Sequence, residues 1–355
     1  MIPFLLIIIE TLMNTFFSMA GPARIAVDSE YVTNPPETLL VQTATMMLGR
    51  KMAIQLYQNS RMPDLPPDFD LHEFLERRPT NGGRSRKEAY ERLCGEFILR
   101  PVKHIHSGLS PLQMYADLHG LQLDPILRVD GLGLLGELDK ENPPPWAIYD
   151  KGGRRWILPE IHLKLIGHFW PADFFRAFGS TYLSQVFRPD DDRHIRGLTV
   201  RSRKNLEIVE PGKRGFSNRP VVQYARDAQG ILYAVRTSFF DTRLPMGEVV
   251  AGSLDAISQA LLGIGKMSEM TKEELSNMAA TFLRDPSKVY AYSTVDAINT
   301  LLIEIAMRQN HAALYHKLKV PSEMVPEMAQ TAGCALSIIL AASWRVIGGA
   351  MDPLW

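Results

Sequence analysis

Cysteine is scarce in this sequence: Cys94 and Cys334 are the only two, and they lie far apart in no C-x-x-C pair. That spacing excludes a zinc ribbon, a thioredoxin-type redox motif and a disulfide framework. An excess of charge of one sign is also missing, because 39 Lys and Arg balance 39 Asp and Glu. No global field therefore draws the chain toward nucleic acid or an anionic membrane, and any polyanion site has to be local.

Long apolar runs are few. Residues 332–344 include two serines and are fewer than the roughly 18 that a membrane-spanning helix needs, so we interpret them as a buried helix. The apolar residues 1–20 have no Lys or Arg before them and are interrupted by Glu10. We interpret them as an extension upstream of the true start, at Met13 or Met19, with a weak membrane or secretory segment as the alternative. A cytoplasmic protein with no membrane partner is expected.

What the chain does contain is enough apolar sequence for a sizeable core, at 46% of 355 residues. Alternating and β-branched runs predict strands, and helical periodicity dominates after residue 253. The predicted strands cover 24–32, 38–47, 51–57, 161–169, 221–225 and 231–238, and the predicted helices cover 253–262, 271–283 and 289–309. The strands 221–225 and 231–238 are expected to form a hairpin, and Thr271-x-x-Glu274 is expected to form a capping box. The first three strands form an antiparallel meander, so an α/β protein with a mixed sheet flanked by helices is expected.

The pattern also predicts a domain organisation. After the extension at 1–20, one α/β domain is expected over 21–310. A proline-rich, charged stretch at about 59–145 is expected to form a helical insertion in it. Residues 311–355 are expected to form a short helical C-terminal extension.

Three acidic motifs carry the predicted chemistry. Asp28-x-Glu30 places two carboxylates on one face of a strand, and Asp173 lies at the junction between a later strand and a helix. Tyr292 and Asp296 are four residues apart, so they project from one helical face. Clustered carboxylates repel one another unless cations hold them, and Mg²⁺ or Mn²⁺ prefers such oxygen ligands. Four acids and one tyrosine therefore predict a site for two divalent cations.

These motifs resemble those of the 3′–5′ exonucleases of the RNase H-like, DnaQ-like class, in the form with a tyrosine in the third motif. The proofreading domain of protein-primed family B DNA polymerases is the most similar. The matching stretches are Val27–Glu30, Leu165–Asp173 and Tyr292-x-x-x-Asp296, in the right order. The resemblance implies that Asp28 bridges two metal ions and that Glu30 and Asp296 complete the first. It further implies that Asp173 serves the second, and that Tyr292 positions the attacking water.

Candidate contacts to single-stranded DNA come from two regions. His168 and Phe169 precede Asp173 and are candidates to contact the 3′-terminal nucleotide; the alternative is a bonded core histidine and a core aromatic. Residues 193–219 contain eight Lys or Arg against two Glu, and Arg201, Arg203 and Lys204 in it are candidates to bind phosphates. A solvated loop is the alternative reading of this segment. Asp241 and Asp255 are expected to be turn and helix-start residues.

Two other function classes remain open at this stage. One is a catalytically inactive nucleic-acid-binding or polymerase-accessory module on the same fold; retention of four acids and Tyr292 argues against it. The other is a ribonuclease on the same fold, since the sugar contact is not visible in the sequence. No polymerase palm follows residue 310, so the expected protein is a stand-alone exonuclease, a partner of a separately encoded polymerase, or a fragment.

Overall fold

A computed structural model provides the structure of the chain. It describes residues 23–32, 38–49, 51–78, 97–104, 109–120, 148–149, 156–157, 160–170, 176–178, 187–188, 191–195, 198–200, 208–209, 221–226, 232–243, 252–267 and 270–317. Among these, no helix combines the length and the apolarity needed to cross a membrane.

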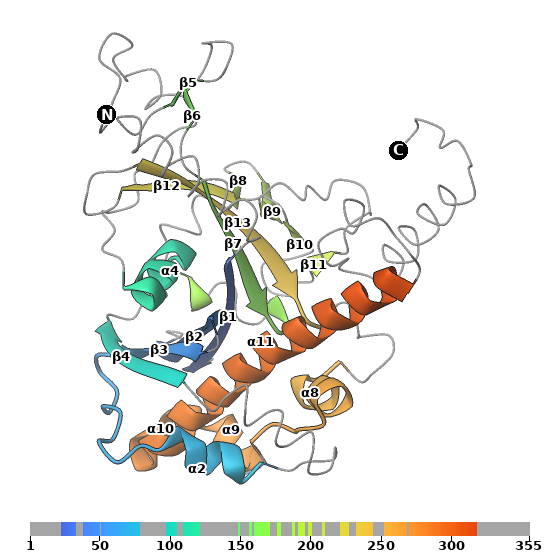
Figure 1. The fold of residues 1–355 in the computed structure, drawn as a ribbon. Coiled ribbons are helices and arrows are strands. Elements are labelled where there is room, and N and C mark those ends of the chain that lie inside the picture. Colours follow the sequence, from blue (N-terminus) through green and yellow to red (C-terminus); the bar gives the residue numbers. More distant parts are fainter. Residues whose placement is uncertain are drawn as a thin grey trace, which may run out of the picture.

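A seven-stranded mixed sheet forms the centre of the fold (Figure 1). In spatial order its strands are β12 (Val221–Arg226), β13 (Leu232–Asp241), β7 (Glu160–Gly167), β1 (Ala23–Val32), β2 (Thr38–Leu48), β3 (Lys51–Asn59) and β4 (Phe97–His104). Strands β13, β7 and β1 are parallel neighbours, β3 and β4 are parallel, and the remaining neighbours are antiparallel. The carboxyl ends of β1, β7 and β13 therefore meet at one edge of the sheet.

Two smaller sheets accompany it. One contains β8 (Phe187–Arg188), β9 (Asp191–Ile195), β10 (Leu198–Val200) and β11 (Ile208–Val209), and the other pairs β5 (Ile148–Tyr149) with β6 (Trp156–Ile157).

The predicted α/β class, the meander and the hairpin are confirmed. Gly49, in the left-handed region at φ 63°, makes the turn between β2 and β3, where a side chain would be strained. The stretch 59–145, expected to be a helical insertion, contains two described helices but also β4, which pairs with β3 along its whole length. Its Phe97-Ile98-Leu99 run has strand propensity, and the outer edge of β3 supplies backbone partners.

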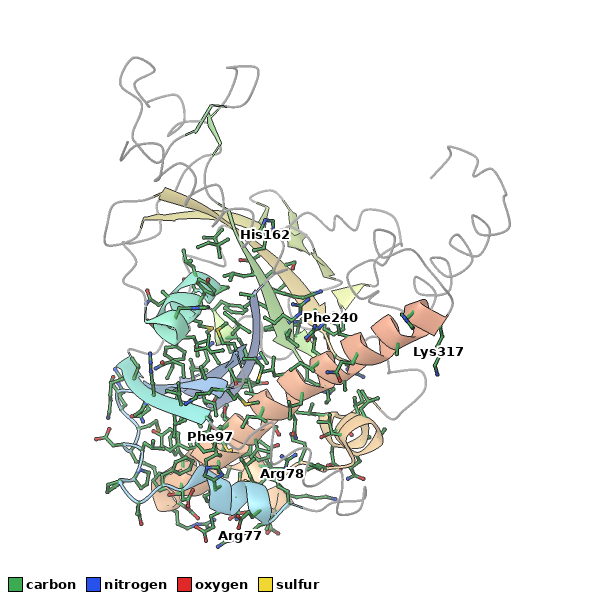
Figure 2. All side chains as sticks on the ribbon, viewed as in Figure 1. Arg77, Arg78, Phe97, His162, Phe240 and Lys317 are labelled. Atoms are coloured by element: carbon green, nitrogen blue, oxygen red, sulfur yellow. The ribbon has the colours of Figure 1, made fainter. Side chains whose placement is uncertain are left out.

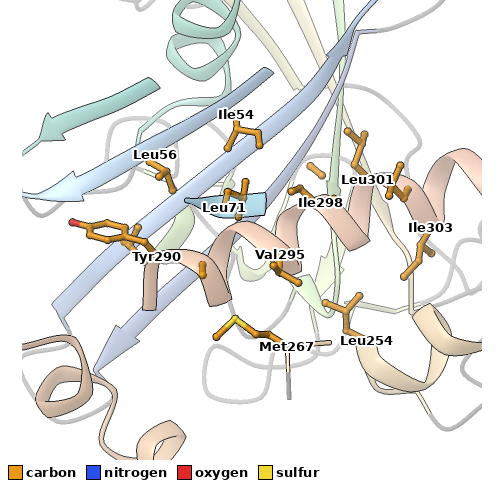
Figure 3. Close-up of a cluster of buried hydrophobic side chains, with 14 of the residues drawn as sticks. Ile54, Leu56, Leu71, Leu254, Met267, Tyr290, Val295, Ile298, Leu301 and Ile303 are labelled. Carbon is orange, nitrogen blue, oxygen red and sulfur yellow. The ribbon is translucent and has the colours of Figure 1, made fainter. Parts of the chain in front are cut away.

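Helices cover both faces of the sheet. They are α2 (Leu71–Glu76), α4 (Pro111–His119), α8 (Leu254–Leu262), α9 (Lys272–Ser276), α10 (Met278–Arg284) and α11 (Pro286–Lys317). One core joins α11, α8, α10 and α2 to one face, and Figure 3 shows its side chains, among them Ile54, Leu254 and Val295. The other core joins α4 and Trp170 to the opposite face. Because both faces of the sheet are covered, β2 and β3 are buried over nearly their whole length.

The C-terminal helices differ in detail from the prediction. Thr271 and Glu274 form the expected capping box, yet the helix that it starts ends at Ser276, and a second helix starts after Asn277. Asn277 accepts a hydrogen bond from the Ala280 N–H and so caps the second helix. Helix α11 is longer than predicted and runs through residue 310, where the sequence places the end of the domain.

Helix α11 is anchored to β1 by a buried ion pair. Arg24 Nε donates to Glu304 Oε1 over 3.0 Å, and the Glu304 side chain is fully buried. Arg308 lies 3.6 Å from the same oxygen. This pair orients α11 across β1, on the face that also carries Asp28 and Glu30.

Gly167, at the end of β7, is required by a close approach. A Cβ at this position would overlap the indole of Trp170, which is buried and donates from Nε1 to the Phe240 carbonyl oxygen over 3.0 Å. Gly167→Ala is therefore expected to lower the free energy of unfolding by about 2 kcal/mol, measured by urea denaturation. The same substitution in a Trp170→Leu background should cost less, and an equal cost in both backgrounds would contradict the overlap.

Candidate metal centre

Three carboxylates converge where β1 passes under α11. Asp28 and Glu30 come from β1 and Asp296 comes from α11, and one oxygen of each lies within 4.8 Å of the others. The two-residue period of the strand turns Asp28 and Glu30 to the face that α11 covers, as predicted. A register shift between β1 and β2 falls directly after Glu30. Such irregularities re-aim side chains next to functional sites.

The carboxylates are held in an environment that disfavours their charge. Burial, together with the charges of Glu30 and Asp296, raises the pKa of Asp28 well above its usual range. Burial also raises the pKa of Asp296, although Lys266 opposes the shift. Asp28 Oδ2 and Asp296 Oδ1 are buried and have no hydrogen-bond partner. Two carboxylate oxygens without donors are the places at which a bound cation would replace lost hydration.

Lys266 is a candidate site residue that the sequence patterns did not indicate. Its ammonium forms an ion pair with Asp296 Oδ2, donates to the Tyr292 hydroxyl over 2.9 Å and lies 4.7 Å from the centre of the Tyr292 ring. Burial lowers the pKa of Lys266, but the neighbouring Asp296 and Tyr292 outweigh this, so the net pKa is raised and the ammonium keeps its charge. A single lysine in the segment between two helices carries no motif that could have revealed it.

The segment that carries Lys266 is held rigidly by α8. Gly263 ends α8 in the left-handed conformation, at φ 71°. Ser258 then donates to the Ile264 carbonyl oxygen over 2.6 Å, and the Lys266 N–H donates to Asp255 Oδ1 over 2.7 Å. Asp255 is thus the helix-start residue that the sequence predicts, and it also fixes the backbone of Lys266.

Tyr292 and Asp296 point into the same space, as their spacing predicts, since both contact Lys266. Burial raises the pKa of Tyr292, and the charge of Asp296 raises it further. The phenol therefore keeps its proton at neutral pH. Because its oxygen accepts from Lys266, its O–H remains able to donate to a group in the site.

Two hydroxyls orient Asp28. Ser293, on α11, donates to the Asp28 carboxylate, and Thr43 lies 2.9 Å from the Ser293 oxygen. Thr43 is the residue of β2 directly opposite Asp28 in the register. The chain Thr43–Ser293–Asp28 thus links β2, α11 and β1 at the point where the carboxylates meet.

The carboxyl end of β7 lies beside this cluster and carries His168 and Phe169. Ala26 of β1 pairs with Ile166 of β7, and Asp28 and His168 each follow two residues later, His168 directly after the end of β7. Phe169 has a positive φ of 62° and is 39% exposed, and the Arg243 guanidinium lies 4.3 Å from its ring centre. Phe169 is therefore a partly exposed aromatic and not the core residue of the alternative reading.

Asp241 holds Phe169 in this strained conformation. Its Oδ1 accepts from the backbone N–H groups of Phe169 and Arg243, and its Oδ2 accepts from that of Trp170. Asp241 is thus the turn residue that the sequence predicts. Two of its three donors belong to the turn after β7, and the third, Arg243, follows Asp241 by two residues.

His168 is a half-buried histidine whose ring forms a hydrogen bond with a neutral hydroxyl group. Its Nδ1 lies 2.9 Å from Thr242 Oγ1. Burial, with a contribution from the charge of Lys266, lowers the pKa of His168 to about 4. The folded state therefore binds this proton less well than the unfolded state does.

That difference predicts a pH dependence of stability. Between pH 6.5 and about 4 the unfolded chain binds more protons at His168 than the folded chain does. The contribution of His168 to the free energy of unfolding is therefore complete above pH 6.5 and is lost as the pH falls. Relative to His168→Gln, the native sequence should lose about 3 kcal/mol of unfolding free energy over this window. Urea denaturation in EDTA at a series of pH values measures it. His72→Gln, at an exposed histidine of α2, is the control, and parallel curves for His168→Gln and the native sequence would refute the assignment.

Four predicted site residues lie outside the described residues: Asp173, Arg201, Arg203 and Lys204. Of the predicted site residues that the structure describes, Asp28, Glu30, Tyr292 and Asp296 come together, with His168 and Phe169 at the same sheet edge. The donor set of three carboxylates, with two buried oxygens lacking partners, fits a hard divalent cation such as Mg²⁺ or Mn²⁺.

Comparison of the chain with protein-family models and with curated proteins gives no match, so its function has to be argued from this geometry.

Proposed function

We propose that this chain is a metal-dependent 3′–5′ exonuclease of the RNase H-like, DnaQ-like class that hydrolyses phosphodiester bonds at the 3′ end of single-stranded DNA. The observation that carries the proposal is the convergence of Asp28, Glu30 and Asp296, with Tyr292 one helical turn before Asp296. The meander β1–β2–β3, extended by the parallel strands β7 and β13, supports the RNase H-like assignment.

In this proposal two divalent cations, Mg²⁺ or Mn²⁺, stabilise the attacking and leaving oxygens when bound. Asp28, Glu30 and Asp296 would hold them through the oxygens that now face one another. Asp173 would add the fourth carboxylate. Tyr292, protonated and held by Lys266, would donate a hydrogen bond that orients the attacking water.

The substrate would approach along the carboxyl edge of β1, β7 and β13. Phe169, partly exposed and backed by Arg243, offers a ring on which a nucleobase can stack next to a cation. His168, directly after β7, would contact the 3′-terminal nucleotide, and Arg201, Arg203 and Lys204 would bind phosphates further along the DNA strand. A DNA polymerase, encoded separately or belonging to a longer protein of which this chain is a fragment, would be the partner of such an activity.

The test is degradation of a 5′-labelled single-stranded DNA with Mg²⁺ or Mn²⁺, alongside a 3′-blocked strand and an RNA of the same sequence. The native protein should shorten the DNA from its free 3′ end, and EDTA or Asp28→Asn should stop it. Asp68→Asn, at an exposed acid before α2, is the matched control. Shortening of RNA alone would establish the ribonuclease alternative. Binding of DNA without any shortening would establish the inactive module and overturn the proposal.

A further inference from the structure

Arg78 is a buried cation two residues after the end of α2, within the stretch 59–145 and far in sequence from every acid of the site. It is 4% exposed. Its Nε and Nη2 atoms donate to the Gly265 carbonyl oxygen over 2.9 and 2.5 Å, and Nη2 also donates to Asn299 Oδ1 over 2.7 Å. Figure 2 labels Arg78 between α2 and α11.

The two acceptors flank the metal centre on different elements. Gly265 directly precedes Lys266, and Asn299 lies one helical turn beyond Asp296 on α11. The other anchors of the Lys266 segment, Ser258 and Asp255, both come from α8. The guanidinium fork of Arg78 therefore fastens that segment to α11 and sets where the Lys266 ammonium lies relative to Asp296.

Lys266 gives the two carboxylate oxygens of Asp296 different surroundings. Oδ2 is occupied by the ammonium, whereas Oδ1 is buried, has no hydrogen-bond partner and belongs to the carboxylate that faces Asp28 and Glu30. A shift of the Lys266 segment toward the cluster would place the ammonium among the carboxylates, where it would compete with a bound cation.

We infer that Arg78 is a positioning residue of the metal centre, which keeps Lys266 on Asp296 Oδ2 and thereby leaves Asp296 Oδ1 for a divalent cation. The role of the cation in hydrolysis rests on the proposed function, but its binding does not. Groups behind metal ligands affect metal affinity by about 10- to 100-fold in other proteins. The stretch that carries α2 thus contributes to the site through Arg78.

The test measures Mn²⁺ affinity by electron paramagnetic resonance without nucleic acid, then kcat and KM on 5′-labelled DNA. Arg78→Met should weaken Mn²⁺ binding about tenfold and lower kcat about tenfold, with KM for DNA unchanged. Arg78→Lys should fail to restore either value, because an ammonium cannot make the planar fork to Gly265 and Asn299. Arg77→Met, at the adjacent and exposed arginine that pairs with Glu73, is the control and should match the native protein.

Several outcomes would overturn the inference. Unchanged Mn²⁺ affinity in Arg78→Met would do so, and full recovery in Arg78→Lys would show that charge alone matters. If Arg78→Met fails to fold, Asn299→Ala removes one arm of the fork and should weaken Mn²⁺ binding, and native affinity in that variant would refute the role. A native protein that binds Mn²⁺ without cutting DNA would defeat the proposed function alone, and one that binds no Mn²⁺ would defeat both.

Discussion

Replacement of Asp28 by asparagine is expected to abolish nuclease activity and at the same time to stabilise the metal-free protein. The Oδ2 atom of Asp28 is buried and has no hydrogen-bond donor, so it is available to a cation. Loss of this carboxylate should lower kcat by about 10³-fold or more. Without a cation, the ionised and partly buried Asp28 lies beside Glu30 and Asp296, which disfavours the folded state. A neutral amide of similar shape removes that repulsion and should add about 1 kcal/mol of unfolding free energy.

The size of this stabilisation depends on pH. The pKa of Asp28 is raised in the folded state, so between its unfolded and its folded pKa the folded protein binds more protons, and stability falls as the pH rises. Asp28→Asn should remove that part of the slope in EDTA, as measured by thermal melting from pH 4 upward. Saturating Mg²⁺ should reverse the order, because the native protein alone binds the cation well. A variant less stable than the native protein in EDTA would show that the carboxylate is stabilised by contacts and not strained.

Replacement of Lys266 by methionine is expected to have the opposite effect on stability. The ammonium is the partner of Asp296 Oδ2 and of the Tyr292 hydroxyl, and its side chain is 25% exposed while that of Asp296 is 4% exposed. Removing one partner of a buried pair leaves the other charge uncompensated, so the free energy of unfolding should fall by about 3 kcal/mol in EDTA. Activity should fall as well, because Tyr292 and Asp296 lose the group that positions them.

Divalent cations should rescue the stability of Lys266→Met more than that of the native protein. With the ammonium gone, both oxygens of Asp296 are available to a cation, so Mg²⁺ should raise the melting temperature of the variant by the larger amount. Lys288→Met is the matched control, since Lys288 pairs with Glu274 at a similar exposure but outside the metal centre. That variant should be destabilised without any rescue by Mg²⁺. A Lys266→Met protein as stable as the native one in EDTA would contradict the ion pair.

The local features of the fold were predictable because they depend on short-range patterns. The period of two in β1 placed Asp28 and Glu30 on one face, and the spacing of Tyr292 and Asp296 placed them on one side of a helix. The spacing of Thr271 and Glu274 likewise predicted a capping box. Asn277 divides the helix predicted over 271–283 into α9 and α10. This division was not predictable, because an asparagine within a helical pattern is equally compatible with a continuous helix.

The contacts that complete the site were not predictable, because they join segments with no periodic relation. Lys266 and Arg78 reach Asp296 and Asn299 from connecting segments whose residue types carry no motif. The strand β4 was missed because its short run lies within charged and proline-rich sequence, and only the free edge of β3 selects it as a strand. Phe169 occupies a strained conformation that follows from Asp241, 72 residues later.

The crossing of β1 by α11 also has a consequence for how the protein folds. Thr43 and Ser293 are 250 residues apart in the chain, and Arg24 and Glu304 are 280 apart. These contacts raise the contact order, and chains with such contacts fold slowly, because a long loop must close before they form. During synthesis the β1–β3 meander emerges long before α11, so Asp28 and Glu30 stay solvated until α11 docks. Assembly of the metal centre is therefore a late folding event, and cation binding would report completion of the fold.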